Sequence, residues 1–152
     1  MEPKIRLAKI DDSLAIAAFQ LKMAIETENL QLEAETVGKG VNAVFEKPGF
    51  GQYFVAEKDG QIIASMLTTF EWSDWRNAQV WWLQSVYVIP EFRRQGIFKR
   101  MYDFVKILAE NEANVGGIRL YVDKTNVRAQ QVYKVVGMNG EHYQVFEWMK
   151  EF

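Results

Sequence analysis

Four cationic side chains gather around Gly96, and the chemistry they suggest is the binding of an anion. A strand-like run gives way there to a helical pattern. A helix start already presents unpaired N–H groups and partial positive charge, so added cations are unfavourable in the free protein. An anion held by backbone donors and arginines would relieve that repulsion. We interpret this segment as a pyrophosphate-binding turn, against the alternative of a solvated charged face. The four cations are Arg93, Arg94, Lys99 and Arg100.

The residues of this turn also match a known signature. The run Arg93-Arg94-Gln95-Gly96-Ile97-Phe98 resembles the Arg/Gln-x-x-Gly-x-Gly/Ala motif of the GCN5-related N-acetyltransferase (GNAT) superfamily, and a strand and a Pro-Glu-aromatic turn precede it. Phe98 departs from the motif, because the family prefers glycine or alanine there. We expect its bulk to leave the backbone N–H usable but to crowd or redirect the pyrophosphate. A second resemblance, to the family's Asn-x-x-Ala-x-x-x-Tyr-x-x-x-Gly-Phe/Met segment, lies in Asn126, Ala129, Tyr133 and Gly137-Met138.

The resemblance implies acetyl-CoA as co-substrate and a primary amine as acceptor. The N–H groups from Arg94 through Lys99 are the natural donors to the pyrophosphate of CoA. The pantetheine arm is peptide-like, so it can pair with an exposed strand edge at Val86–Val88. If two strands separate there, an unpaired N–H near Tyr87 or Val88 can polarise the thioester carbonyl. The predicted cofactor-binding residues are Val86, Tyr87, Val88, Arg93, Arg94, Gln95, Gly96, Ile97, Phe98, Lys99, Asn126, Ala129 and Tyr133.

The leaving thiolate needs a proton, and by resemblance Tyr133 is the general acid while Asn126 contacts the CoA arm. The spacing of Asn126, Ala129 and Tyr133 places all three on one helical face. A phenol, with a pKa of about 10, can protonate a thiolate whose conjugate acid has a pKa near 8.5 only if its surroundings favour the transfer. The alternative is a tyrosine that packs its ring in the core and hydrogen-bonds its hydroxyl.

The attacking amine must be neutral, so a base or a water path is needed. Four carboxylates at predicted element ends are candidates, and Glu71 is our first choice over Asp74, Glu26 and Glu28. Solvated turns are the alternative interpretation of these carboxylates. Neighbouring tryptophans could bind a cationic amine through cation–π contact. We assign Trp81 and Trp82 to packing on opposite faces of their strand. The predicted acceptor-binding residues are Glu28, Trp72, Asp74 and Trp75.

Hydrophobic periodicity and turn residues predict the elements that must position these side chains. Expected strands cover residues 4–8, 52–57, 61–71, 79–89, 118–122 and 142–149. Four helices are expected. The first begins after an N-cap at Asp11-Asp12, and the second ends near Phe45. The third runs from Gly96 to near Asn114, and the last covers 126–136 with Gly137 as its C-cap. Asp59-Gly60 is a strong hairpin signal. The order β-α-α-β-β-β-α-β-α-β predicts an α/β fold: a mostly antiparallel, splayed mixed sheet with helices on both faces, in one domain over 1–152.

Composition excludes several function classes. Hydrophobic residues are 49% and charged residues 25% of the 152, which is ordinary for a globular domain able to bury a core. Without cysteine there can be no disulfide, thiolate metal site or cysteine nucleophile, and a single histidine, His142, argues against a histidine metal cluster. The net charge of −2 gives no footprint for nucleic acid. We therefore predict no metal and no nucleic-acid partner.

No apolar run approaches the length of a bilayer span, and Met1-Glu2-Pro3-Lys4 lacks a signal-peptide core. We expect a cytoplasmic protein without a membrane partner, and a homodimer is a candidate assembly. The leading hypothesis is an N-acetyltransferase in which an amine attacks acetyl-CoA directly. One alternative is a non-catalytic acyl-CoA-binding module, suggested by Phe98 and the lack of an obvious base. The other is an interaction domain that uses the cation cluster as a patch.

Overall fold

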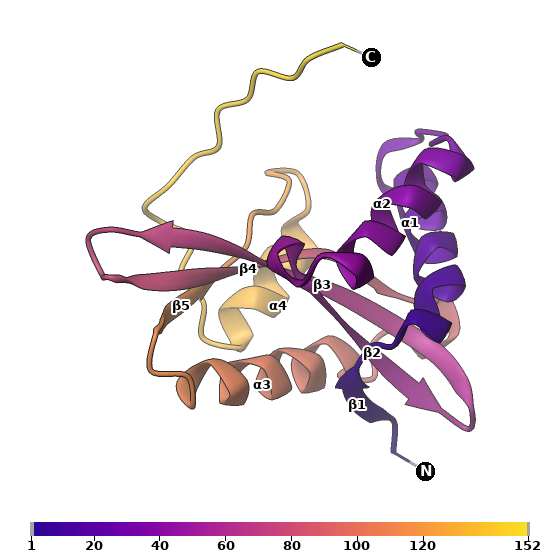
Figure 1. Ribbon diagram of the computed structural model, residues 1–152, viewed down its shortest axis with the longest axis horizontal. Coiled ribbons are helices and arrows are strands. Elements are labelled where there is room, and N and C mark those ends of the chain that lie inside the picture. Colours follow the sequence, from indigo (N-terminus) through magenta and orange to yellow (C-terminus); the bar gives the residue numbers. More distant parts are fainter. Residues whose placement is uncertain (1, 152) are drawn as a thin grey trace. The chain divides into compact units, whose positions relative to one another are not determined.

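The computed structural model describes residues 2–151 and divides into two compact units, one up to Arg119 and one from Leu120 onward. The first unit contains a five-stranded sheet in the order β1-β2-β3-β4-β5 (Figure 1). Neighbouring strands are antiparallel except for the parallel pair β4–β5. The expected mixed, mostly antiparallel sheet is confirmed. Its strands are β1 (Lys4–Leu7), β2 (Gln52–Lys58), β3 (Gln61–Ser73), β4 (Ala78–Val88) and β5 (Val115–Arg119).

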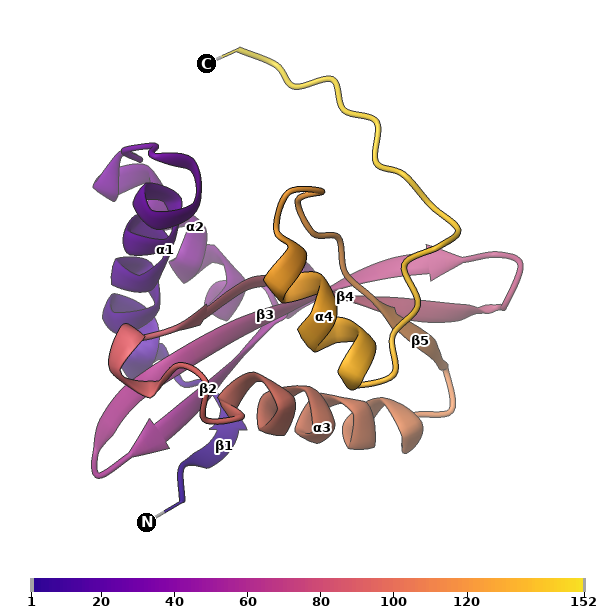
Figure 2. The same ribbon diagram turned by 180° about the vertical axis from the view of Figure 1, so that it is seen from behind.

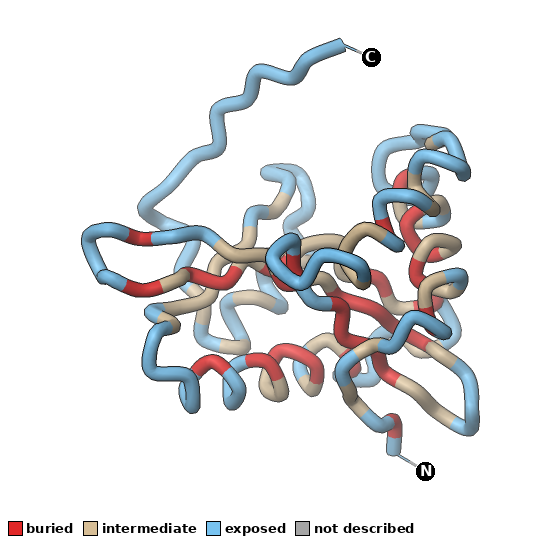
Figure 3. Tube along the Cα trace, in the orientation of Figure 1, coloured by how far each residue is buried: buried red, intermediate tan, exposed pale blue. Residues whose placement is uncertain are grey.

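Helices cover both faces of this sheet, as the sequence predicts (Figure 2). Helices α1 (Ser13–Glu28) and α2 (Ala34–Glu46) pack on one face, where Ile16 and Val41 contact the strand residues Tyr53 and Val55. Helix α3 (Ile97–Glu110) lies on the other face. Side chains alternate along a strand, so Phe54 points to that second face and meets the Phe104 ring at 6.0 Å. The buried stretches of β2, β3 and β4 between these layers form the core (Figure 3).

Two hairpins set the register of the sheet. Asp59 and Gly60 both have positive φ, 51° and 78°, as a two-residue turn of the twist-compatible kind requires. This turn joins β2 to β3 at the predicted place. The second hairpin joins the long strands β3 and β4, and Asn77 in its turn has a φ of 50°. Strand β4 therefore runs back along β3 and ends at the predicted phosphate turn.

An ion-pair network fixes the first strand. Asp12 is the N-cap residue of α1, as predicted, but its carboxylate does not cap the helix. It accepts instead from the Arg6 guanidinium at 2.8 and 3.0 Å and from the Lys9 N–H at 2.7 Å. Arg6 also donates to Glu57 on β2 at 2.9 Å. The hydrogen bond from Arg6 is the main cause that holds the pKa of the Asp12 carboxyl below its ordinary value, although burial opposes it.

Strand β5 begins earlier than expected. Gly116-Gly117 lies inside the strand instead of breaking the chain before Ile118. A Cβ on Gly116 would meet Arg76 Cδ at 3.2 Å and Ala78 Cβ at 3.5 Å. Glycine therefore lets β5 approach the β3–β4 hairpin closely, which the sequence pattern alone does not reveal.

The second unit contains helix α4 (Val127–Val135). Asn126 Oδ1 accepts from the Ala129 N–H at 3.1 Å and so caps the helix start. At the other end Gly137 has a φ of 95°, its N–H donates to Lys134 O at 3.0 Å, and the Met138 N–H donates to Tyr133 O at 3.0 Å. These paired bonds form the Schellman arrangement, which confirms Gly137 as the C-cap.

The last predicted strand is wrong. Residues 142–149 have the alternating pattern of a strand, but they form none, and no strand within residues 2–151 pairs with them. A strand needs the hydrogen bonds of a neighbour as well as the pattern, and Phe146 and Trp148 remain 91% and 86% exposed. None of the described helices combines the length and apolar character of a membrane span.

Candidate active site

The predicted separation of two strands is present between β4 and β5. The ladder begins with Gln79 beside Val115 and reaches Trp82 beside Arg119. Beyond that pair, no strand in the described part of the chain pairs with β4 on its β5 side. The segment Leu83–Val88 therefore offers about 20 Å of strand edge on that side. This is the geometry that an extended, peptide-like ligand needs.

A bulge bends β4 within this open segment. Ser65 lies opposite Tyr87 and Leu67 opposite Gln84, so two residues of β4 face Met66 alone. One of the two, Ser85, has a φ of 52°. An extra residue in one strand interrupts the regular ladder and redirects the backbone groups around it. The bulged residues Ser85 and Val86 directly precede Tyr87 and Val88, near which the sequence predicts a backbone donor to a thioester carbonyl.

A connection that contains the short 3-10 helix η3 (Pro90–Phe92) and ends at Gly96 leads from β4 to helix α3. Gly96 is the N-cap of α3, with a φ of 76° and ψ of 17°, and no side chain caps this helix end. The first intrahelical bond runs from the Arg100 N–H to Gly96 O, so the preceding N–H groups have no partner within the helix. A Cβ added at Gly96 would meet no atom within 4 Å. Backbone donors and open space thus coincide, as an anion site requires.

The cations of this turn are mostly paired within the protein. Lys99 contacts Asp103 at 2.7 Å, and Arg100 contacts Glu2 at 2.6 Å and donates to Pro3 O at 2.7 Å. Arg93 is paired as well, and among residues 2–151 only Arg94 of the four makes no hydrogen bond or ion pair. Three of the four cations are thus compensated by carboxylates of the protein itself: Glu26 on α1, Asp103 on α3 and Glu2 before β1.

Arg93 joins helix α1 to the end of β4. Its Nε donates to Val88 O at 2.8 Å, and its Nη2 donates to Glu26 Oε1 at 2.7 Å. The other Glu26 oxygen accepts from the Tyr87 hydroxyl, and the Arg93 guanidinium lies 5.3 Å from the Tyr87 ring centre. The Tyr87 bond, with Arg93 second, holds the pKa of the Glu26 carboxyl below its ordinary value despite some burial. Burial and the Glu26 contact raise the pKa of Tyr87 to about 12.

Glu71 lies on the same strand as Trp72, but the two point to opposite faces of the sheet because side chains alternate. Glu71 accepts from Arg119 Nη1 on β5 at 2.9 Å. Trp75 and Asp74 lie in the hairpin turn, and Trp75 is 93% exposed. The structure thus does not gather the predicted acceptor residues into one cluster. Glu28, at the exposed end of α1, lies apart from them in the sequence and on another element.

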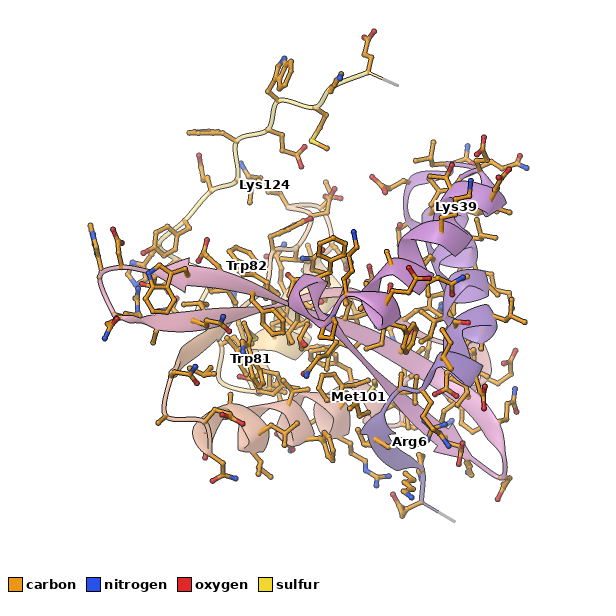
Figure 4. All side chains as sticks on the ribbon, in the orientation of Figure 1. Arg6, Lys39, Trp81, Trp82, Met101 and Lys124 are labelled. Atoms are coloured by element: carbon orange, nitrogen blue, oxygen red, sulfur yellow. The ribbon has the colours of Figure 1, made fainter. Side chains whose placement is uncertain are left out.

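Other side chains share the face of Glu71, and the sequence reasoning missed two of them. Trp82 pairs in register with Thr69 on one side and Arg119 on the other. Gln84 Nε2 donates to Thr69 Oγ1 at 2.6 Å. Figure 4 shows Trp82 and Trp81 on opposite sides of β4, and Trp81 is buried against Phe70 at 6.3 Å, as predicted for packing. No sequence motif marks Arg119 or Gln84; only the sheet register brings them together.

In the second unit, Tyr133 is half-buried on α4, and burial raises the pKa of its phenol. The phenol is therefore protonated throughout the neutral range and is a weaker acid than an exposed tyrosine. The Asn126 amide oxygen already accepts the helix-capping bond described above. Its NH2 group is the part left for another contact.

The model of the acetyltransferase (GNAT) family matches residues 17–138. The chain belongs to this family. A possible acetyltransferase from Clostridium difficile 630 is similar to this GNAT protein over 100% of both chains, with 36% identity and a TM-score of 0.91. The comparison with curated proteins gives no match.

More distant solved structures share the fold of this GNAT protein. A predicted acetyltransferase from Clostridium acetobutylicum, solved with acetyl-CoA, is 21% identical with a TM-score of 0.74, and the match covers 99% of this chain and 96% of that one. Glucosamine-6-phosphate N-acetyltransferase from Arabidopsis thaliana is 18% identical with a TM-score of 0.74, over 99% and 100% of the two chains. Acetyl-CoA is the co-substrate of the family.

Phe98, the residue at which this GNAT protein departs from its family motif, packs along helix α3. Phe98 is half-buried in the first turn of α3, and its ring stacks on Tyr102 with centroids 6.1 Å apart and planes at 23°. Tyr102 is buried, so it anchors the Phe98 ring along the helix. The side chain thus has a packing role, and the backbone N–H of the same residue belongs to the unpaired group at the helix start.

Proposed function

We propose that this GNAT protein is an N-acetyltransferase, one acetyltransferase domain over residues 1–152, in which a primary amine attacks acetyl-CoA directly. The observation that carries the proposal is the continuous path from the open β4 edge into the Gly96 turn. The strand edge would bind the pantetheine arm, and the unpaired N–H groups and free space at the helix start would bind the pyrophosphate. These two features follow one another along the chain as the two groups do in CoA. The N-acetyltransferase from Arabidopsis thaliana with the same fold supports the choice of nitrogen as the acceptor atom.

The turn residues would hold the diphosphate mainly through their backbone. The N–H groups between Arg94 and Lys99 are the donors, with Arg94 as the cation available to the anion. Arg93 would instead fix the end of β4, because it already binds Val88 O and Glu26. Gln95 is held through its side chain, which donates to Glu91 O at 3.1 Å. Ile97 is buried and anchors the helix start from below.

The open edge of β4 would bind the pantetheine arm through Val86, Tyr87 and Val88. A backbone N–H near the bulge would then stabilise the charge that develops on the carbonyl oxygen as nitrogen attacks, an effect commonly worth about 3 kcal/mol. Tyr133 would donate its phenolic proton to the sulfur as the carbon–sulfur bond breaks. Asn126 and Ala129 match the family segment beside it and would contact the cofactor arm.

Glu71 remains the proposed base or amine-binding carboxylate. It lies on β3 opposite Val80, three residues from the start of the open β4 edge, which is about 10 Å along the strand. Trp72, Asp74, Trp75 and Glu28 remain proposed acceptor contacts. Glu26 is a weaker candidate for the base, because Tyr87 and Arg93 occupy both of its oxygens. Cytoplasmic location and homodimeric assembly also remain predictions.

A non-catalytic acyl-CoA-binding module is the second candidate, and two observations favour it: Phe98 at the motif's small position, and the engagement of Glu71 by Arg119. Calorimetry with CoA, combined with thiol release from acetyl-CoA over a panel of amines, separates the two. An acetyltransferase binds CoA and releases thiol only when a suitable amine is present. Binding without release on any amine would favour the module, and no binding would contradict both.

A further inference from the structure

Two side chains close the connection between β4 and α3 onto itself. Arg93 Nε donates to Val88 O at 2.8 Å, across the short helix η3. Gln95 Nε2 donates to Glu91 O at 3.1 Å within the same connection, and Gly96 then begins α3. These bonds tie the end of the open β4 edge to the turn in front of the helix.

The bond from Arg93 lies on the open side of β4. The Ile89 N–H donates to Ile63 O at 2.9 Å, and the next pair of the ladder is Val88 opposite Ala64. Opposite residues of an antiparallel ladder alternate between pairs that exchange hydrogen bonds and pairs that do not. The N–H and the carbonyl of Val88 therefore both point away from β3. Arg93 occupies the carbonyl, and the N–H of Val88 remains for a ligand on this edge.

Glu26, in the last turn of α1, holds the Arg93 side chain in this place. One carboxylate oxygen accepts from Arg93 Nη2 at 2.7 Å, and the other accepts from the Tyr87 hydroxyl. Tyr87 is buried, and its ring centre lies 5.2 Å from that of Phe19 on the same helix. Glu26 thus connects a ring anchored in the core to the guanidinium that covers Val88 O.

Charge alone gives Glu26 the opposite effect to the one that an anion site needs. Its carboxylate lies 2.7 Å from the Arg93 guanidinium, so it repels a bound phosphate and competes for the cation. The pair also contributes little stability, because the Glu26 and Arg93 side chains are 36% and 42% exposed. What remains is a geometric effect: the carboxylate orders the Arg93 side chain, and with it the connection, before a ligand arrives.

This inference rests on the placement of CoA in the proposed function, with the pantetheine arm on the β4 edge and the pyrophosphate at Gly96. We propose that Glu26 is a positioning residue for acetyl-CoA, which acts through Arg93 to fix the spacing between these two parts of the site. A ligand that spans two parts gains affinity only when their spacing matches its own length. The brace from Glu26 through Arg93 to Val88 sets that spacing in the free protein, so binding does not have to order the connection.

Two ligands that share a pyrophosphate test this brace. Calorimetry measures the Kd of CoA, which spans both parts of the site, and of 3′-phosphoadenosine 5′-diphosphate, which lacks the pantetheine arm. Glu26→Ala should raise the Kd of CoA by about three- to tenfold, the cost of ordering one long side chain on binding. The Kd of the diphosphate should stay unchanged or fall. Release of Arg93 as a free cation would by itself tighten the binding of both ligands, so the two explanations differ in sign for CoA.

Further variants identify the route of the effect. Arg93→Lys keeps the charge, but an ammonium on a flexible stem does not reproduce the two fixed contacts, so the Kd of CoA should rise by a similar factor. Glu26→Ala should then add little in the Arg93→Lys background, because both changes break one brace. Asp103→Ala is the matched control. It removes the carboxylate partner of Lys99, another cation near the turn, but this ion pair lies within α3. It should not raise the Kd of CoA.

Each outcome supports or overturns the inference. Unchanged or tighter binding of CoA by Glu26→Ala overturns it. An equal loss for the diphosphate also overturns it, because Glu26 then supports the pyrophosphate turn alone. A full further loss from Glu26→Ala in the Arg93→Lys background contradicts a route through Arg93. All of these are binding measurements, so absence of transfer to every amine would overturn the proposed N-acetyltransferase and leave the role of Glu26 standing.

Discussion

Replacing Gly96 by alanine tests whether a phosphate group approaches the turn before α3. Gly96 has a φ of 76°, in the left-handed region, where an L-residue is less stable by about 1–2 kcal/mol. The alanine Cβ would meet no atom within 4 Å, so no clash adds to this strain. We expect Gly96→Ala to fold and to lose about 1–2 kcal/mol of unfolding free energy.

Gly60 supplies a matched control. Its φ is 78°, and a Cβ there also meets nothing within 4 Å, but it lies in the β2–β3 hairpin turn and has no place in the proposed site. Gly60→Ala should therefore lose a similar amount of stability. Any difference between the two variants in their response to CoA then reports on the site and not on backbone strain.

The assay is urea unfolding with and without CoA. At a hundredfold the Kd, CoA should stabilise the wild type and Gly60→Ala by about 2.7 kcal/mol. In Gly96→Ala the methyl group occupies the space proposed for the phosphate. If the Kd rises tenfold, the same CoA concentration stabilises by only about 1.4 kcal/mol. Equal stabilisation of the two variants would refute the placement of the phosphate at Gly96.

Three further changes probe other parts of the molecule. Tyr133→Phe should lower turnover by about 10²-fold with little change in CoA affinity by calorimetry, because only the donated proton is lost; wild-type turnover would exclude the general-acid role. Phe98→Gly should lose about 1–2 kcal/mol of stability in urea, from glycine entropy and the lost Tyr102 stacking, while CoA affinity stays equal or improves; a collapse of affinity would make the ring a ligand contact. Asp12→Asn should cost about 2 kcal/mol at neutral pH. Because the folded pKa of Asp12 is depressed, this cost should shrink as pH falls below its ordinary value of 3.8 and vanish below the folded pKa; a cost independent of pH would contradict the ion-pair explanation.

Local signals predicted the parts of the site that are contiguous in the chain. The β-branched run of β4, its end before Pro90 and the glycine at the start of α3 are neighbours in sequence, so their conformations follow from propensity and turn chemistry. The Asp59-Gly60 turn likewise set the pairing of β2 with β3 next to the hairpin, up to the register shift between Ala56 and Glu57. The strand–turn–helix segment that carries the proposed site could therefore be predicted from the sequence.

Contacts between residues that are far apart in the chain could not be predicted from the sequence. Glu26 and Tyr87 are 61 positions apart, and Glu26 and Arg93 are 67 apart. No periodicity links them, and only the packing of α1 beside the end of β4 brings the carboxylate to both. The same holds for Glu71 and Arg119, which are 48 positions apart and meet through the strand register. The prediction of a strand over 142–149 was wrong because an alternating pattern does not by itself provide a neighbouring strand to pair with.

The pairing of Arg93 changes the physical account of the turn. Three of the four cations are compensated by Glu26, Asp103 and Glu2, so charge excess alone does not create a site there. An anion at this turn would depend on the backbone N–H groups, which side chains leave uncapped, and on Arg94. Because Arg93 ties the turn to Val88 and to α1 in the free protein, binding would not have to order it. Such preorganisation lowers the entropic cost of binding. The start of α3 at Gly96, which no side chain caps, could therefore bind an anion even though most of the neighbouring cations are already paired.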